Sequence, residues 1–281
     1  MPGTLYVVAT PIGNLEDITL RALRVLGEVT LIAAEDTRTT RKLLARYDIH
    51  TPLTSLHAHT EAGKIAALVD RLHAGEDLAV VSEAGTPGIS DPGEALVRAA
   101  VAAGVRVLPV PGPSALVAAL SVGGLPVVRF VFEGFLPRTP AERRRRLAAL
   151  RDDTRAAVFY ESPRRLAITL RELYEVLGNR PAVVARELTK QFEEVRRGHL
   201  GELVDAFAMP VRGEVVIIVA GAAEAAPPAS PQRVTTRVAE LLQEGLSPSA
   251  AARQAAEEMG VSRREAYAAA LRQRSGEQAE E

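Results

Sequence analysis

The sequence predicts two α/β domains followed by a small C-terminal helical module. In the first 125 residues, short apolar runs alternate with segments of helical spacing, which is typical of a largely parallel sheet covered by helices. A second series of apolar runs and helices continues to residue 221. Near the C-terminus, three short helical segments carry capping residues and glycine stops, which is typical of a helix-turn-helix.

The predicted first domain covers residues 1–124, and Gly123–Pro126 marks its end. Its apolar runs predict buried strands. The strands are expected at Leu5–Ala9, Val29–Ala34, Leu78–Val81 and Val105–Val110. The helices are expected at Leu20–Leu26, Arg41–Tyr47, Glu61–His73, Glu94–Ala103 and Ala115–Val122, and glycines follow several of them.

The predicted second domain covers residues 125–221. Its strands are expected at Val127–Phe132, Ala156–Tyr160, Ala182–Ala185 and Val215–Ala220, and its clearer helices at Arg164–Leu177 and Glu202–Phe207. Residues 222–232 are rich in alanine and proline and predict a linker. Residues 233–275 form the helix-turn-helix-like module, with Ser247 as a helix cap and a capping box at Ser262 and Glu265.

Composition excludes several classes of site. The chain has 281 residues, a formal net charge of −1 and no cysteine, so disulfides, thiolate catalysis and zinc fingers are excluded. No apolar stretch reaches the roughly 18 residues that span a bilayer, so we expect no membrane partner. His57 and His59 lack further ligands in sequence, and we expect no metal.

Three loops rich in glycine, proline, serine and threonine each follow a predicted strand. They are Thr10–Leu15, Ser82–Gly93 and Pro111–Ala115. Ligands of open α/β sheets bind beyond the carboxyl ends of the strands, so we expect a binding site there. The sequence has neither G-x-x-x-x-G-K-[ST] nor G-x-G-x-x-G, which argues against an ATPase and a standard dinucleotide site.

Several segments resemble one known superfamily. They are ATPIGNLEDIT, AEDTRTTRKLL, SEAGTPGISDPG and PGPSALVAALSVGGLP, and they are similar to the tetrapyrrole methylases. With GFLPR, YESPRR and ARELTKQFEE, the chain resembles the ribosomal RNA small subunit methyltransferase I branch, which 2′-O-methylates a cytidine in the decoding region of 16S rRNA. The resemblance covers nearly the whole chain, including the C-terminal module.

The resemblance implies the tetrapyrrole-methylase fold, a cytoplasmic homodimer, and S-adenosyl-L-methionine bound in a cleft between the two α/β domains. The small ribosomal subunit is the implied partner. Carried onto this sequence, the cofactor contacts are Pro11, Ala84, Gly85, Thr86, Ile89, Ser90, Ser114, Ala115, Tyr160, Leu188 and Val215.

A ribose hydroxyl needs a base that accepts its proton. Glu35, Asp36 and Glu83 are the preferred candidates, and Asp91 and Glu187 are further ones. We expect Asp36→Ala or Glu83→Ala to abolish methyl transfer. Arg38 and Arg186 are expected to hold a phosphate. An equally weighted alternative makes Glu35, Asp36 and Arg38 a structural cluster of ion pairs and caps.

Arginines cluster in the second domain and indicate RNA contact. The predicted contacts are Arg143, Arg144, Arg145, Arg146, Arg164 and Arg165. The alternative is a solvated helix face partly neutralised by nearby acids. The C-terminal module is expected to bind phosphates or to recognise the shape of the ribosome rather than to read bases, because the narrow major groove of duplex RNA does not admit a helix.

Two other functions stay open at this point. A methylase of a precorrin-like tetrapyrrole would share the fold and the cofactor, without needing the arginine cluster or the helical module. A helix-turn-helix DNA-binding regulator would use the C-terminal module, without needing the three loops.

Overall fold

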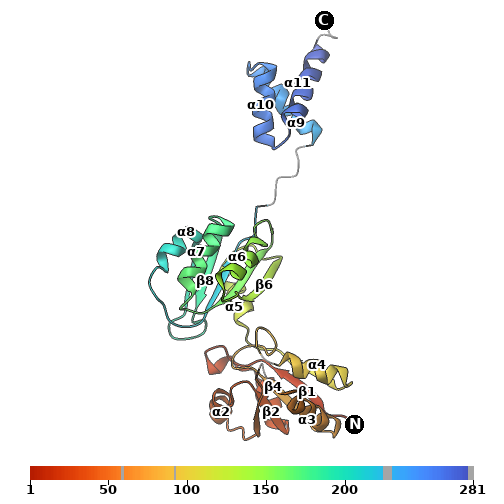
Figure 1. Cartoon of the computed structure of the whole chain (residues 1–281), viewed down its shortest axis with the longest axis vertical. Coiled ribbons are helices and arrows are strands. Elements are labelled where there is room, and N and C mark those ends of the chain that lie inside the picture. The colour runs from red at the N-terminus through yellow and green to blue at the C-terminus, as the bar shows by residue number, and fades with distance from the viewer. Residues whose placement is uncertain (58–59, 92, 224–229, 278–281) are drawn as a thin grey trace. The chain divides into compact units, whose positions relative to one another are not determined.

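The computed structural model describes residues 1–57, 60–91, 93–223 and 230–277 (Figure 1). Side chains are described as far as residue 272. The chain divides into two compact units, Met1–Ala222 and Ala223–Glu281. The first unit contains two five-stranded sheets, and the second contains three helices. Most of the predicted linker, residues 224–229, lies outside the described residues.

The first sheet is parallel throughout, with strand order β3-β2-β4-β1-β5. Its strands are β1 (Thr4–Val8), β2 (Leu31–Ala34), β3 (Leu53–Ser55), β4 (Leu78–Val81) and β5 (Arg106–Val110). The parallel sheet was predicted, but β3 was not. Three residues at a sheet edge are too short to form a recognisable apolar run.

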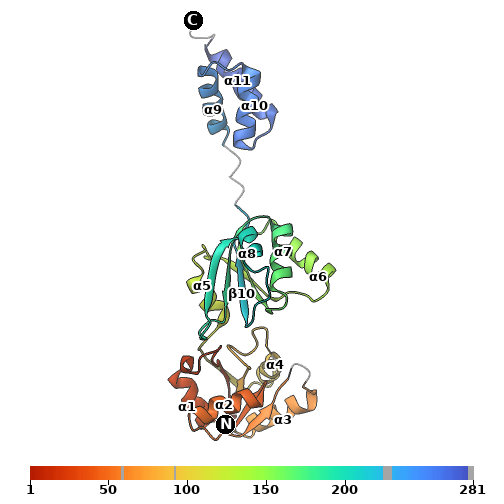
Figure 2. The same ribbon diagram turned by 90° about the vertical axis from the view of Figure 1, so that its left-hand side faces the viewer.

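Helices cover both faces of this sheet (Figure 2). They are α1 (Leu20–Glu28), α2 (Thr37–Arg46), α3 (Ala62–His73) and α4 (Glu94–Ala102). Alternate strand residues face opposite ways, so Ile32 packs with α1 and α2, whereas Leu31 packs with α3 and α4. Gly27, predicted to end the first helix, lies inside α1. The burial of Val25 and Leu26 holds that last turn in place.

The second sheet is mixed, with strand order β6-β7-β10-β8-β9. Its strands are β6 (Phe130–Phe135), β7 (Ala156–Glu161), β8 (Pro181–Arg186), β9 (Glu194–His199) and β10 (Val215–Val219). Only β6 and β7 run parallel, while β10 is antiparallel to both of its neighbours. The edge strand β9 was not predicted, because its sequence EVRRGH is polar and none of its residues is buried.

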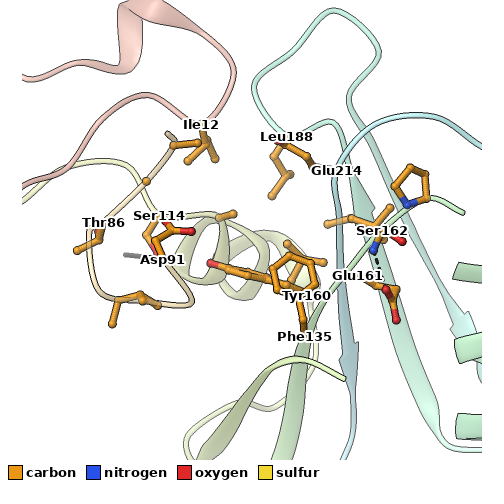
Figure 3. A pocket seen from close by; sticks show the side chains of 18 residues that line it. Ile12, Thr86, Asp91, Ser114, Phe135, Tyr160, Glu161, Ser162, Leu188 and Glu214 are labelled. Carbon is orange, nitrogen blue, oxygen red and sulfur yellow. Dashed lines mark hydrogen bonds between the residues drawn. The ribbon is translucent and has the colours of Figure 1, made fainter. Parts of the chain in front are cut away.

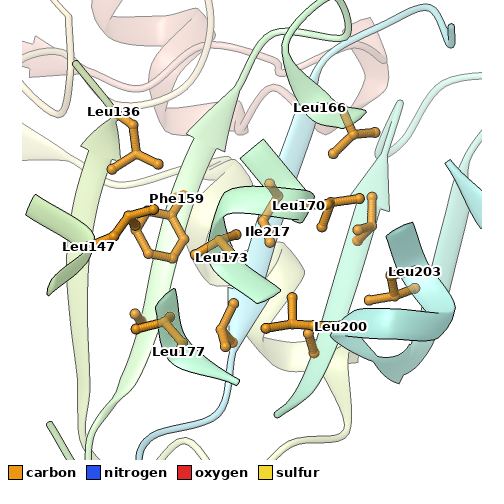
Figure 4. Close-up of a cluster of buried hydrophobic side chains, with 14 of the residues drawn as sticks. Leu136, Leu147, Phe159, Leu166, Leu170, Leu173, Leu177, Leu200, Leu203 and Ile217 are labelled. Carbon is orange, nitrogen blue, oxygen red and sulfur yellow. The ribbon is translucent and has the colours of Figure 1, made fainter. Parts of the chain in front are cut away.

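One face of the second sheet carries a large apolar core (Figure 4). Helices α6 (Pro140–Ala148), α7 (Leu166–Leu177) and α8 (Leu200–Ala206) cover this face. Phe159 and Ile217 from the sheet, together with Leu170 from α7, are fully buried in it. This core fixes the strand ends that carry the site described below.

Helix α5 (Ala115–Gly123) packs on the other face of the second sheet, where Ala119 joins Val158 and Val183 in a separate apolar cluster. The Arg197 side chain of β9 also donates hydrogen bonds to the carbonyls of Val122 and Gly123, at the end of α5. The division predicted after residue 124 therefore does not match the packing. Although α5 follows β5 directly, its apolar surface is buried against the second sheet.

Arg143 is buried, which corrects its predicted role in RNA contact. Its guanidinium donates hydrogen bonds to both carboxylate oxygens of Glu172, one of them at 2.7 Å, and to the carbonyls of Pro137 and Arg138. The hydrogen bonds from Arg143 to the Glu172 carboxylate hold the pKa of Glu172 below its ordinary value. The neighbouring Arg144, Arg145 and Arg146 of the run are exposed, so Arg143 alone among the four is buried.

The second unit consists of α9 (Pro231–Gln243), α10 (Pro248–Met259) and α11 (Arg263–Glu277). Ser247 caps α10 by accepting the Ala250 N–H, and Ser262 and Glu265 form the predicted capping box. Alanines such as Ala255 and Ala269 fill the core, which lets α10 and α11 approach closely. In the described part of the chain, no helix combines the length and apolar character needed to cross a bilayer.

The buried pair of Arg143 and Glu172 allows a test of its contribution to stability. Arg143→Met should lower the free energy of unfolding by roughly 3–5 kcal/mol, because it leaves the Glu172 carboxylate buried without its partner. Arg145→Met removes the same charge from an exposed position on α6 and should change it by no more than about 0.5 kcal/mol. Urea unfolding measures both, and equal effects of the two substitutions would contradict a structural role for Arg143.

Candidate active site

The three predicted loops meet at one edge of the first sheet. They follow β1, β4 and β5, which are neighbours in the order β4-β1-β5, and parallel strands end at the same edge. Thr10 and Gly85 exchange backbone hydrogen bonds of 2.8 and 3.0 Å, which join the loops after β1 and β4. Gly85 has φ +79°, a conformation that favours glycine.

One end of the second sheet lies beside these three loops. In its register, Val215 at the start of β10 lies between Glu161 at the end of β7 and Arg186 at the end of β8. The antiparallel β10 therefore begins where β7 and β8 end. Turns and strand ends from these strands, and Phe135 from β6, form the second wall.

A cavity of about 300 Å³ lies between the loops and this wall (Figure 3). Its lining comprises Ile12, Ala84, Gly85, Thr86, Ile89, Asp91, Ser114, Ala115, Phe135, Tyr160, Glu161, Ser162, Pro163, Ala185, Leu188, Glu214, Val215 and Val216. All of the residues predicted to contact a cofactor line this cavity, except Pro11 and Ser90. Ile12, the neighbour of Pro11, lines the cavity instead of Pro11. Ile12, Phe135, Glu214 and the Glu161–Pro163 turn were not predicted, although their positions beside strand ends are visible in the sequence.

Tyr160 connects the cavity to α5. Its hydroxyl oxygen accepts the Leu116 N–H at 3.1 Å, in the first turn of α5. Its ring makes edge-on contacts with Phe132 and Phe135, at centroid distances of 4.9 and 5.7 Å. Burial raises the pKa of the Tyr160 hydroxyl, so it stays protonated. The proton leaves this group able to donate a hydrogen bond while it accepts one from α5.

Asp91 is the carboxyl group in the cavity with the most perturbed acidity. Burial, followed by repulsion from Glu35, raises its pKa from 3.8 to about 6, and Glu83 and Glu214 add to the effect. Figure 3 shows Asp91 and Ser114 on one side of the cavity and Glu214 and Leu188 on the other. A carboxyl group with this pKa can accept and release a proton near neutral pH.

Asp36 is a helix cap, which argues against its predicted role as a base. Its carboxylate accepts the N–H groups of Arg38 and Thr39 at the start of α2 and pairs with the Arg38 guanidinium at 3.1 Å. The side-chain hydrogen bond from Arg38 is the largest of the causes that lower the pKa of Asp36 to about 2. Such a carboxylate is a poor proton acceptor at neutral pH.

The other two preferred candidates lie beside the cavity. The Glu35 carboxylate accepts the Glu83 N–H at 3.1 Å, and the exposed Glu83 begins the loop after β4. Neither belongs to the described lining of the cavity. The cap and ion pair of Asp36 and Arg38 therefore favour the open alternative of a structural cluster, and Glu35 joins the ends of two neighbouring strands.

Glu187, the remaining candidate, is tied to Lys190. The Lys190 ammonium donates to Glu187 at 2.9 Å and to Glu214 at 3.1 Å. The hydrogen bond from Lys190 lowers the pKa of Glu187. Any Cβ at Gly13 would lie 2.5 Å from the Lys190 Cγ, so glycine there lets the loop after β1 approach the second sheet.

The predicted RNA-contacting arginines separate into two groups. Arg144, Arg145, Arg146 and Arg164 are exposed. Arg165 donates to the carbonyls of Leu136 and Pro137 and pairs with Glu161 at 3.3 Å. His59 lies outside the described residues, so the predicted pair with His57 is not described.

A family model described as Tetrapyrrole (Corrin/Porphyrin) Methylases matches residues 4–204, and one described as RsmI C-terminal HTH domain matches residues 228–274. The ribosomal RNA small subunit methyltransferase I of Xylella fastidiosa is 54% identical over 272 residues, covering 95% of this chain and 98% of that protein. Its Escherichia coli O157:H7 counterpart is 47% identical and covers 96% of both chains. The chain belongs to the ribosomal RNA small subunit methyltransferase I family of tetrapyrrole methylases.

Solved structures agree with this family's fold. The methyltransferase CobJ superposes with a TM-score of 0.59 at 23% identity, covering 80% of this chain and 97% of that one. The uroporphyrin-III C-methyltransferase of Thermus thermophilus, complexed with S-adenyl homocysteine, gives 0.52 at 20% identity, with coverages of 77% and 97%. These likenesses confirm the predicted tetrapyrrole-methylase fold.

The raised pKa of Asp91 predicts a stability change with a definite sign. The folded chain binds this proton more tightly than the unfolded chain, so the free energy of unfolding falls as pH rises from about 4 to about 6. Asp91→Asn removes the effect and should raise Tm above about pH 7, with the difference vanishing near pH 4.

Calorimetric melts across this pH range measure the change. Asp70→Asn, at an exposed position of α3, is the matched control and should leave Tm unchanged. A lower Tm for Asp91→Asn at neutral pH would show instead that the Asp91 carboxylate stabilises the fold.

Proposed function

We propose that this chain transfers the methyl group of S-adenosylmethionine to the ribose 2′-hydroxyl of a cytidine in the decoding region of 16S rRNA. The observation that carries the proposal is the group of nearly full-length relatives, at 47% to 54% identity, that are named for methylation of small-subunit ribosomal RNA. The solved neighbours named for methylation of uroporphyrin-III and cobalt precorrin-4 are only 22% and 19% identical and support the fold alone. No observation favours a tetrapyrrole substrate or a DNA-binding regulator.

The cavity suits the cofactor. Its volume of about 300 Å³ is that of a small-molecule site, in which the loops of the first sheet face an apolar wall. Leu188, Val215 and Phe135 supply that wall, while Thr86 and Ser114 supply hydroxyl groups. S-adenosylmethionine contributes a methyl carbon bonded to a sulfonium, which the ribose oxygen attacks. The Thermus thermophilus enzyme that shares the fold is complexed with the product form of this cofactor.

Asp91 is the proposed proton acceptor. As the new O–C bond forms and the S–C bond breaks, the proton of the ribose hydroxyl passes to the Asp91 carboxylate. Tyr160, held by Leu116, directs its hydroxyl group toward Asp91 and Ser114 (Figure 3), where it provides a fixed polar group near the proposed base. The exposed Arg144, Arg145 and Arg164 remain proposed contacts for RNA phosphates.

The homodimer and the cytoplasmic location also remain proposals. The ribosomal substrate supports the cytoplasmic location.

The substrate is tested by methyl incorporation. The purified chain is mixed with S-adenosylmethionine labelled in its methyl group and with small ribosomal subunits, naked 16S rRNA, a tetrapyrrole precursor or duplex DNA. We expect label in the ribosomal RNA, recovered as 2′-O-methylcytidine after digestion to nucleosides and mass spectrometry. Label in the tetrapyrrole or the DNA, with none in the RNA, would overturn the proposed function.

The base is tested by a pH profile. If Asp91 accepts the proton, kcat/KM should rise with pH up to about 6, where the raised pKa lies, and then level off. Asp91→Asn should lower kcat by about 10²–10⁴-fold and abolish this rise, because amides do not accept the proton. Cofactor affinity, measured by calorimetry, should persist.

Asp36→Asn and Glu83→Gln are the matched controls, because they change carboxylates that lie outside the described lining of the cavity. Both should retain kcat within a few-fold. Loss of activity in either control, with full activity in Asp91→Asn, would reassign the base to Asp36 or Glu83.

A further inference from the structure

The charged side chains of the C-terminal module form two groups. One group surrounds Arg237 of α9, whose guanidinium pairs with Glu240 at 2.8 Å, Glu244 at 3.6 Å and Glu258 at 2.8 Å. A further acid, Glu265, is bound in the capping box of α11. Most of the described acidic side chains of this module are therefore satisfied within it.

The second group consists of arginines that line a pocket. This arginine pocket has a volume of about 570 Å³ and is lined by Ser247, Ser249, Ala250, Ala252, Arg253, Arg263, Arg264 and Tyr267. No acidic side chain is among these described lining residues. Arg253 and Arg264 have no hydrogen bond or ion pair from their side chains to any described residue, and Arg263 reaches only Glu257, at 3.9 Å.

Helix geometry explains how these side chains come together. Ser249 and Arg253 are four residues apart on α10, and Arg264 and Tyr267 are three apart on α11, so each pair shares a helix face. The alanines of the core, such as Ala252, are small enough to let the two helices pack closely. Arg253, Arg263 and Arg264 thereby line the same pocket, and an anion bound there would offset their like charges.

We infer that the arginine pocket binds the phosphodiester backbone of the RNA substrate. The inference rests on the proposed function for the identity of the nucleic acid. Planar guanidinium groups without protein partners match phosphate oxygens in pairs. Tyr267, which is 44% exposed, offers a ring beside them for a base or ribose. Because backbone contacts do not depend on sequence, the pocket adds affinity and orientation while the cavity of the first unit performs the chemistry.

The test uses the full chain and an RNA hairpin from the small-subunit decoding region, with binding followed by fluorescence anisotropy at several salt concentrations. The variant Arg253→Ala/Arg264→Ala should weaken binding about tenfold or more. The slope of log affinity against log salt should become shallower by about 2, one unit for each phosphate that the variant no longer neutralises. Arg253→Lys/Arg264→Lys should recover part of the affinity, since lysine keeps the charge.

Arg233→Ala/Arg272→Ala is the matched control, because it removes the same charge from exposed positions of the module that do not line the pocket. Its affinity should stay within about twofold of the unaltered chain. Equal losses of affinity in the two double variants would overturn the pocket and indicate a general charge effect.

The outcomes separate this inference from the proposed function. Calorimetric affinity for S-adenosylmethionine should be the same in all variants. If the chain methylates 16S rRNA while Arg253→Ala/Arg264→Ala binds the hairpin unchanged, the pocket inference fails and the function stands. If the chain prefers duplex DNA over the hairpin, and the double variant abolishes that preference, the pocket exists but its assignment to RNA is overturned.

Discussion

Two reciprocal backbone hydrogen bonds between Thr10 and Gly85 fix the geometry on which the site depends. They lock together the loops after β1 and β4, which the parallel sheet already brings to one edge. Gly85 can pair in this way because its φ of +79° suits a residue without a side chain. The loop after β5 then passes directly into α5, which is buried against the second sheet and held to Tyr160 by the Leu116 N–H. The helix α5 thus connects the loops of the first sheet to the wall that the second sheet forms on the other side of the cavity.

Strands that are buried on both faces were predictable from sequence. The bounds of β4, Leu78–Val81, agree with the predicted run because all four residues are buried and apolar. The same signal is absent from β9, whose arginines and glutamate sit at an exposed edge, and from the three-residue β3. The placement of α5 also escaped prediction, since periodicity shows that a helix has an apolar face but not which sheet covers it.

The walls of the site were predictable, and its acid–base chemistry was not. Glycine- and proline-rich loops and the family resemblance indicated most of the cavity lining. The pKa of Asp91, however, depends on burial and on Glu35 and Glu214, which are distant in sequence. Arg143 is buried and pairs with Glu172, a residue distant in sequence, whereas the adjacent Arg144 is exposed. Interactions of this kind arise from tertiary packing and leave no local pattern.

The central claim is that the cavity between the loops and the second sheet holds the methyl donor. A crystal structure of this chain with S-adenosylhomocysteine tests it most directly. The account predicts ligand density bounded by Ile12 and Ala84–Thr86 on one side and by Tyr160 and Leu188 on the other. Full-occupancy density at any other place, with this cavity holding only solvent, would contradict it.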